Sequence, residues 1–127
     1  MSLSKIRLEL ARDYDFPEGS RERGYEFTAP LAADGRILES EWRAARDRCR
    51  ARRFWNGEPD EVGHLIRKPG GSWAFHYDLL GDPDDDEAGY RFGDHKFMTG
   101  EYVSIKEHDD VLRTFKVVAV LKLKALP

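Results

Sequence analysis

Alternation of apolar and polar residues with a period of two dominates the chain and predicts a mostly β protein. In KIRLELAR the residues Ile6, Leu8 and Leu10 fall on one face, and charged residues fall on the other. The same alternation recurs in GYEFTAPL, VGHLIRK, SWAFHYDL, GYRFG, GEYVSIK and TFKVVAVLKL. Turn-forming residues such as PGG at 69–71 separate these segments. The pattern therefore predicts about seven short strands.

One segment departs from this alternation and predicts a helix near residues 39–53. Leu38, Trp42, Ala45 and Cys49 recur at helical spacing, which places them on one buried stripe. Ser40 is a suitable N-cap at its start. The single Cys49 lies on the inward stripe, so we expect a buried and unreactive thiol.

Seven strands and one helix in 127 residues predict one domain that spans residues 1–127. The expected fold is mainly β (α+β): a small antiparallel curled sheet, or a partly open barrel, with the helix at an end or across one face.

Composition narrows the class of protein. Apolar residues make up 40% of the chain and charged residues 35%, which suits a globular domain with a heavily charged surface. No apolar run approaches the roughly 20 residues of a membrane helix, and the N-terminus lacks the pattern of a secretory signal. A lone cysteine cannot form an internal disulfide. These features predict a cytoplasmic protein without a membrane contact.

Charge is segregated along the chain, although its net value is only −3. Residues 36–55 hold seven arginines and three carboxylates, whereas the run GDPDDDEAG at 81–89 is strongly acidic. Guanidinium groups pair bidentately with carboxylate or phosphate. We therefore expect a partner-binding surface on the helix. Its residues would be Arg43, Arg46, Arg50, Arg53 and Trp55.

The partner predicted for this surface is an acidic protein segment or another anionic ligand. Self-association is an alternative, in which the arginines of one copy meet DPDDDE of another. Weak nucleic-acid binding is a second alternative, which the negative net charge disfavours. In the competing structural interpretation, these arginines pair with carboxylates of their own chain and only cover apolar surface.

A small-ligand or enzymatic barrel is the other class of function. Its candidate pocket would hold His76, Asp78 and His95 inside the barrel. The sequence has no HExxH, paired Cys/His spacing, phosphate-binding glycine loop or G-x-S-x-G motif. The acidic run also lacks the glycine and glutamate that a calcium loop requires. We accordingly assign no catalytic residue, metal or cofactor, and favour a non-catalytic role.

Three segments carry a resemblance to other proteins. WRAARDRCRARRFWNGE, GGSWAFHYD and GYRFGDHKFMTGEYVSIKEHDDVLRTFKVVAV are similar to a group of small bacterial proteins of unassigned function. The resemblance covers most of the chain and implies no site residues, because that group carries no assigned chemistry.

Overall fold

A computed structural model describes residues 2–78, 90–92, 95–107 and 109–123 of the chain. In chain order the elements are β1 (Leu3–Leu10), β2 (Ser20–Pro30), α1 (Glu39–Ala44), the 3-10 turn η1 (Arg46–Arg48), β3 (Arg50–Trp55), β4 (Glu58–Arg67), β5 (Trp73–Tyr77), β6 (Tyr90–Phe92), β7 (Tyr102–Lys106) and β8 (Leu112–Lys122). The predicted fold class is confirmed: the protein is mostly β, with a curled antiparallel sheet and one short helix.

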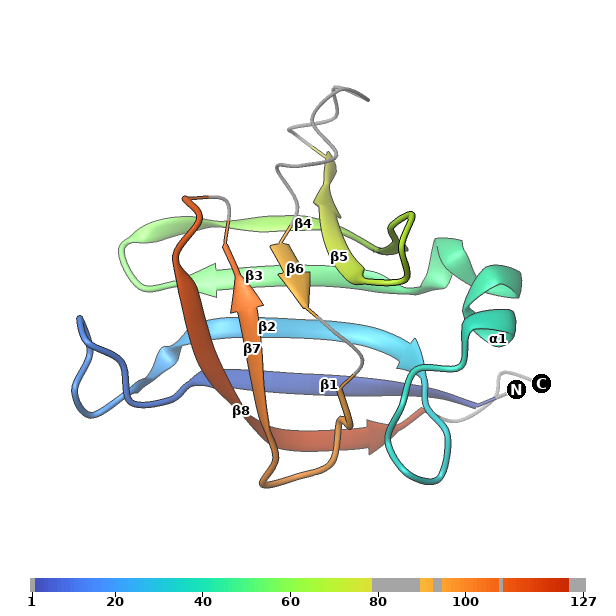
Figure 1. Cartoon of the computed structure of the whole chain (residues 1–127), viewed down its shortest axis with the longest axis horizontal. Helices are drawn as coiled ribbons and strands as arrows, with labels where there is room; N and C mark the ends of the chain where they lie inside the picture. The colour runs from blue at the N-terminus through green and yellow to red at the C-terminus, as the bar shows by residue number, and fades with distance from the viewer. Residues whose placement is uncertain (1, 79–89, 93–94, 108, 124–127) are drawn as a thin grey trace.

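Each strand pairs with its neighbours in the sequence, and β1 also pairs with β8. The described strands number eight, and together they close a barrel (Figure 1). Between β6 and β7 the described residues include one ladder pair, Arg91 with Lys106. Sequence alternation could not distinguish a closed barrel from a partly open one, because closure depends on pairing between the first and last strands.

The inward face of the strands is the apolar face that the alternation predicts. Ile6 and Leu8 of β1 are fully buried, and aromatic rings from β2, β5 and β8 meet in the interior. Tyr25 stacks on Phe75 with ring centroids 5.3 Å apart and meets Phe115 edge-on at 5.0 Å. These rings fill the middle of the barrel and separate its two ends.

The helix is much shorter than the sequence predicts, which corrects the expected range 39–53. α1 covers Glu39–Ala44, and Arg50–Trp55 form β3. Three of the four residues of the predicted stripe, Trp42, Ala45 and Cys49, are nevertheless buried. The α1 helix is anchored by Trp42, whose indole N–H donates to the Leu65 carbonyl at 2.9 Å.

The sequence does not indicate a strand at residues 50–55, because a charged residue occupies one of its inward positions. Arg53 is buried between the inward residues Ala51 and Trp55, and it interrupts the alternation of apolar and polar residues by which the other strands are recognised. Phe54 points outward, yet it is buried beneath Arg7 and Arg52. Its partner on β2 is Gly24, where a Cβ would lie 3.0 Å from the ring.

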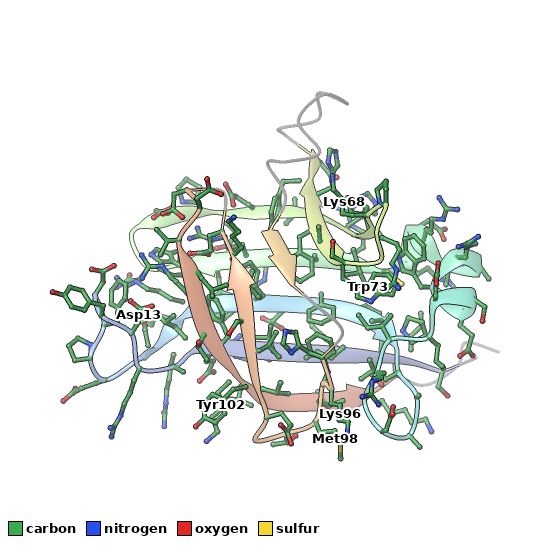
Figure 2. The ribbon with its side chains drawn as sticks, viewed as in Figure 1. Asp13, Lys68, Trp73, Lys96, Met98 and Tyr102 are labelled. Atoms are coloured by element: carbon green, nitrogen blue, oxygen red, sulfur yellow. The ribbon has the colours of Figure 1, made fainter. Side chains whose placement is uncertain are left out.

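The two ends of the barrel are covered differently (Figure 1). α1 and η1 lie at one end, and the loop that joins β1 to β2 lies at the other. Figure 2 places Trp73 near α1 and Asp13 in the β1–β2 loop. No helix among the described residues has the length and apolarity needed to cross a membrane.

Candidate functional sites at the two ends of the barrel

The arginine-rich segment is divided between the two ends of the barrel instead of forming one helical surface. Arg43 and Arg46 are exposed at the α1 end. Arg53 and Trp55 are buried near the other end, with only 5% and 9% of their surface exposed. The prediction that Arg53 and Trp55 join Arg43 and Arg46 in one exposed surface is therefore wrong, because β3 carries them into the barrel.

Arg53 belongs to a buried polar group that we call the glutamate cluster: Tyr25, Arg53, Glu107 and Arg113. The Glu107 carboxylate receives a hydrogen bond from Arg53 Nε at 3.2 Å and lies 3.2 Å from Arg113 Nε. The Tyr25 hydroxyl also donates to this carboxylate. Polar groups from three strands, β2, β3 and β8, thus surround one buried carboxylate, which the β7–β8 turn supplies.

Burial is the main reason why the pKa of Tyr25 is raised well above its ordinary value near 10, and the charge of Glu107 adds to the effect. A phenolate here would lose its hydration and lie beside a carboxylate. Tyr25 therefore keeps its proton over the physiological range and acts as a hydrogen-bond donor. This arrangement suits a structural role better than general base catalysis.

The β1–β2 loop closes this end of the barrel over the glutamate cluster. Asp13 and Asp15 of the loop pair with Arg113 at 2.7 and 3.1 Å. Phe16 packs edge-on against Trp55 with centroids 6.0 Å apart, and the Arg23 guanidinium lies 4.4 Å from the Phe16 ring. The cluster is thus sealed by contacts within the chain.

Arg50 lies on the outer face of the barrel and is also paired. Its guanidinium donates to Asp78 at 2.8 Å and lies 2.6 Å from Nε2 of His64. The hydrogen bond from Arg50 is the main cause of the lowered pKa of Asp78. Arg50 therefore pairs with a carboxylate of its own chain, as the competing structural interpretation of the arginines predicts.

The candidate pocket of His76, Asp78 and His95 is not inside the barrel. His76 lies on the outer face, opposite His64 in the β4–β5 ladder, while Trp73, Phe75 and Tyr77 occupy the inward positions of β5. Asp78 is exposed and pairs with Arg50 on the outer face, and His95 follows β6 and is partly buried. No cluster of three or more His, Cys, Asp or Glu residues in this part of the chain could hold a metal ion.

The thiol of Cys49 is buried, as predicted. Burial raises its pKa to about 11, despite the nearby Arg48. The thiol is therefore protonated at neutral pH and is a poor nucleophile. Cys49 is part of the core.

The arginines at the α1 end, three of them exposed and Arg67 partly buried at the end of β4, differ from those of β3. We call Arg43, Arg46, Arg48 and Arg67 the arginine end. Arg43 pairs with Glu39 at 2.7 Å. The other three form no ion pair with any residue that the structure describes.

Two tryptophans support the arginine end. The Arg46 guanidinium lies 5.1 Å from the Trp42 ring, and Arg67 lies 4.6 Å from the Trp73 ring. The two indoles meet edge-on with centroids 5.2 Å apart. Arg46 and Arg67 are thus connected through packed aromatic rings, so the arginine end has a rigid base.

No pattern in the sequence connects Tyr25, Glu107 and Arg113 as a group. Alternation does place Tyr25 on the buried face, and a buried hydroxyl needs a hydrogen-bond partner. That requirement was the one available signal. It could not identify Glu107, which is 82 residues away in the chain and stands in the KEHDD segment beside a predicted turn.

Comparisons of the chain with protein-family models, curated proteins and solved structures find no match. The resemblance to small bacterial proteins accordingly stays a prediction.

Proposed function

We propose that the protein is a non-catalytic binding module that contacts an acidic protein segment with its arginine end. The observation that carries the proposal is the difference in pairing between the two sets of arginines. Arg46, Arg48 and Arg67 form no ion pair within the described part of the chain, whereas Arg50, Arg53 and Arg113 do. Guanidinium groups without a carboxylate partner can accept one from outside at little cost.

The aromatic base beneath these arginines also supports the proposal. Binding hot spots are enriched in arginine and tryptophan. A guanidinium that stacks on an aromatic ring is already oriented, so it has less conformational freedom to lose when it binds. Trp42 and Trp73 are almost fully buried, so they hold Arg46 and Arg67 without being available themselves. The contact would be electrostatic, modest in affinity and sensitive to salt.

The surface proposed here is smaller than the one that the sequence predicts. Arg43 and Arg46 stay in it, Arg48 and Arg67 join it, and Arg50, Arg53 and Trp55 leave it. Self-association through the acidic run is one form of the same proposal. That run, DPDDDE at 82–87, lies outside the described residues.

A labelled glutamate-rich peptide tests the proposal by fluorescence anisotropy. The wild-type protein should bind it, and the Arg46→Glu/Arg48→Glu variant should lose at least tenfold in affinity, about 1.4 kcal/mol. The matched control is Lys96→Glu/Lys122→Glu, which makes the same change of charge on exposed residues outside the arginine end.

Two outcomes would contradict the proposal. Equal losses in both double variants would mean that only the net charge matters. Tighter binding of a single-stranded oligonucleotide than of the peptide, lost at high salt, would favour the nucleic-acid alternative.

A further inference from the structure

A second candidate site lies on the outer surface of the barrel, at the base of the β1–β2 loop. It is an open hollow of about 670 Å³ between this loop and the outward residues of β7 and β8. We call it the outer groove. Its volume falls in the range of small-molecule sites, roughly 300–1,000 Å³.

A bulge in the β1–β2 pair directs the β1–β2 loop away from the sheet beside the outer groove. Glu9 pairs with Gly24, but the next residue, Leu10, pairs with Ser20. Gly19 then turns the loop tightly against β1 with a φ of +71°, and a Cβ there would lie 2.6 Å from the Leu10 carbonyl oxygen. The loop therefore leaves the sheet abruptly and forms one wall of the hollow.

Positive charge predominates in the outer groove. Arg12, Arg21 and Lys116 line it, and none of the three forms an ion pair with a residue that the structure describes. Two carboxylates also line it. Glu9 is already bound by Arg7 Nε at 2.8 Å, which leaves Glu18 as the one carboxylate whose charge is not offset by such a contact.

The opposite wall carries an exposed aromatic side chain beside one of these cations. Tyr102 of β7 is 57% exposed and pairs directly with Lys116 of β8, so their side chains are cross-strand neighbours on one face. Val118 and Thr114 lie along the same wall. Figure 2 shows Tyr102 at the outer surface of the barrel.

We propose that the outer groove binds a small ligand that joins a phosphate group to a flat ring, of the class of a nucleoside monophosphate. Arg12, Arg21 and Lys116 would hold the phosphate through charge-assisted hydrogen bonds. The Tyr102 ring would stack on the base, as aromatic side chains do with unpaired bases. This site is separate from the arginine end, which lies across the barrel beside α1 (Figure 1).

Calorimetric titration with adenosine monophosphate, adenosine and inorganic phosphate tests the proposal. The wild-type protein should bind the monophosphate at least tenfold more tightly than adenosine or phosphate alone, since only the monophosphate offers both parts. Arg21→Ala/Lys116→Ala should lose at least tenfold in affinity for the monophosphate. Tyr102→Ala should reduce its affinity to that of inorganic phosphate.

The matched control is Arg46→Ala/Arg48→Ala, which removes two cations from the arginine end and should bind the monophosphate as the wild type does. Unchanged melting temperatures would verify that the surface variants are folded. No heat of binding up to about 10 mM ligand, equal affinity for adenosine, or undiminished binding by Arg21→Ala/Lys116→Ala would each overturn the proposal. Because the peptide assay uses the other end, either proposal can fail alone.

Discussion

The two ends of the barrel use the same residue type in opposite ways. At the end that the β1–β2 loop covers, which we call the closed end, Arg53 is buried, Arg113 is mostly buried, and both lie beside the carboxylate of Glu107. At the arginine end, Arg46 and Arg48 are exposed and have no such partner among the described residues. Arg46 and Arg53 are seven positions apart in the chain, so local composition does not decide whether an arginine is buried and paired.

The degree of burial and the carboxylates within reach decide whether an arginine forms an ion pair. A guanidinium that enters the barrel loses its hydration and must be paired, because an isolated buried charge costs several kcal/mol. An exposed guanidinium keeps its hydration and pays no such cost. Removing a charge at the closed end should therefore affect stability, whereas removing one at the arginine end should affect binding.

Replacement of Glu107 by Ala should give the largest effect on stability. It would leave Arg53 and Arg113 without their shared carboxylate and Tyr25 without its acceptor. We expect a loss of about 3 to 5 kcal/mol in the free energy of unfolding, measured with urea at neutral pH.

Two further variants sharpen this measurement. Glu107→Gln keeps the shape and one acceptor and should be less harmful, so it remains informative if the alanine variant does not fold. Glu101→Ala removes an exposed glutamate and should change stability by less than about 0.5 kcal/mol. Similar losses at positions 101 and 107 would refute the special status of the closed end.

Replacement of Tyr25 by Phe should rank second. It removes the hydroxyl that donates to Glu107 and should cost about 2 to 3 kcal/mol at neutral pH, because a buried carboxylate loses a donor.

The same variant should also change how the free energy of unfolding depends on pH in alkaline solution. The pKa of Tyr25 is raised in the folded protein, so between the unfolded pKa near 10 and the folded value only the folded chain keeps this proton.

The sign of the pH effect follows from that difference. Unfolding releases the proton of Tyr25, so wild-type stability should fall as the pH rises above about 10. Tyr25→Phe should show a shallower fall over the same range. Tyr14→Phe, at a fully exposed tyrosine, should retain the wild-type slope; parallel curves for all three proteins would exclude Tyr25 as the source.

Replacement of Asp13 by Asn should have a smaller effect, about 1 kcal/mol. The amide oxygen can still accept from Arg113, but the charge of the partly buried pair is lost. Asp15→Asn is the comparison, since Asp15 is mostly exposed and should contribute less than about 0.5 kcal/mol. Equal effects from both variants would mean that burial of Asp13 adds nothing to its pairing with Arg113.

The sequence predicts most of the sheet, because the alternation of apolar and polar residues can be recognised within each strand separately. Ile6, Leu8, Trp73 and Phe75 are buried where the alternation places them. The sequence also predicts that Cys49 is buried, although Cys49 follows the short 3-10 turn η1 and does not lie in a long helix. Periodicity is a local property, and the inward face of a strand can be assigned from a few neighbouring residues.

The sites were harder to predict because they depend on residues far apart in the chain. Arg53 breaks the alternation of β3, and its explanation, Glu107, is 54 residues away. The sequence offers an interior pocket with His76 as an alternative, yet the inward rings on either side of His76 in β5 place it on the outer face. In the outer groove, Arg21 and Lys116 come together only through barrel closure.

The smallest effect on stability is expected for Arg46→Ala/Arg48→Ala. Loss of the contact between Arg46 and Trp42 should cost no more than about 0.5 kcal/mol, since a cation–π pair at the surface is worth little. Urea unfolding would measure this change beside peptide binding by the same sample. A loss above about 1.5 kcal/mol with peptide binding intact would make these arginines structural, like those of the closed end, and would remove the basis for a binding role. Unchanged stability with binding lost would locate function at the end where charge is left unpaired.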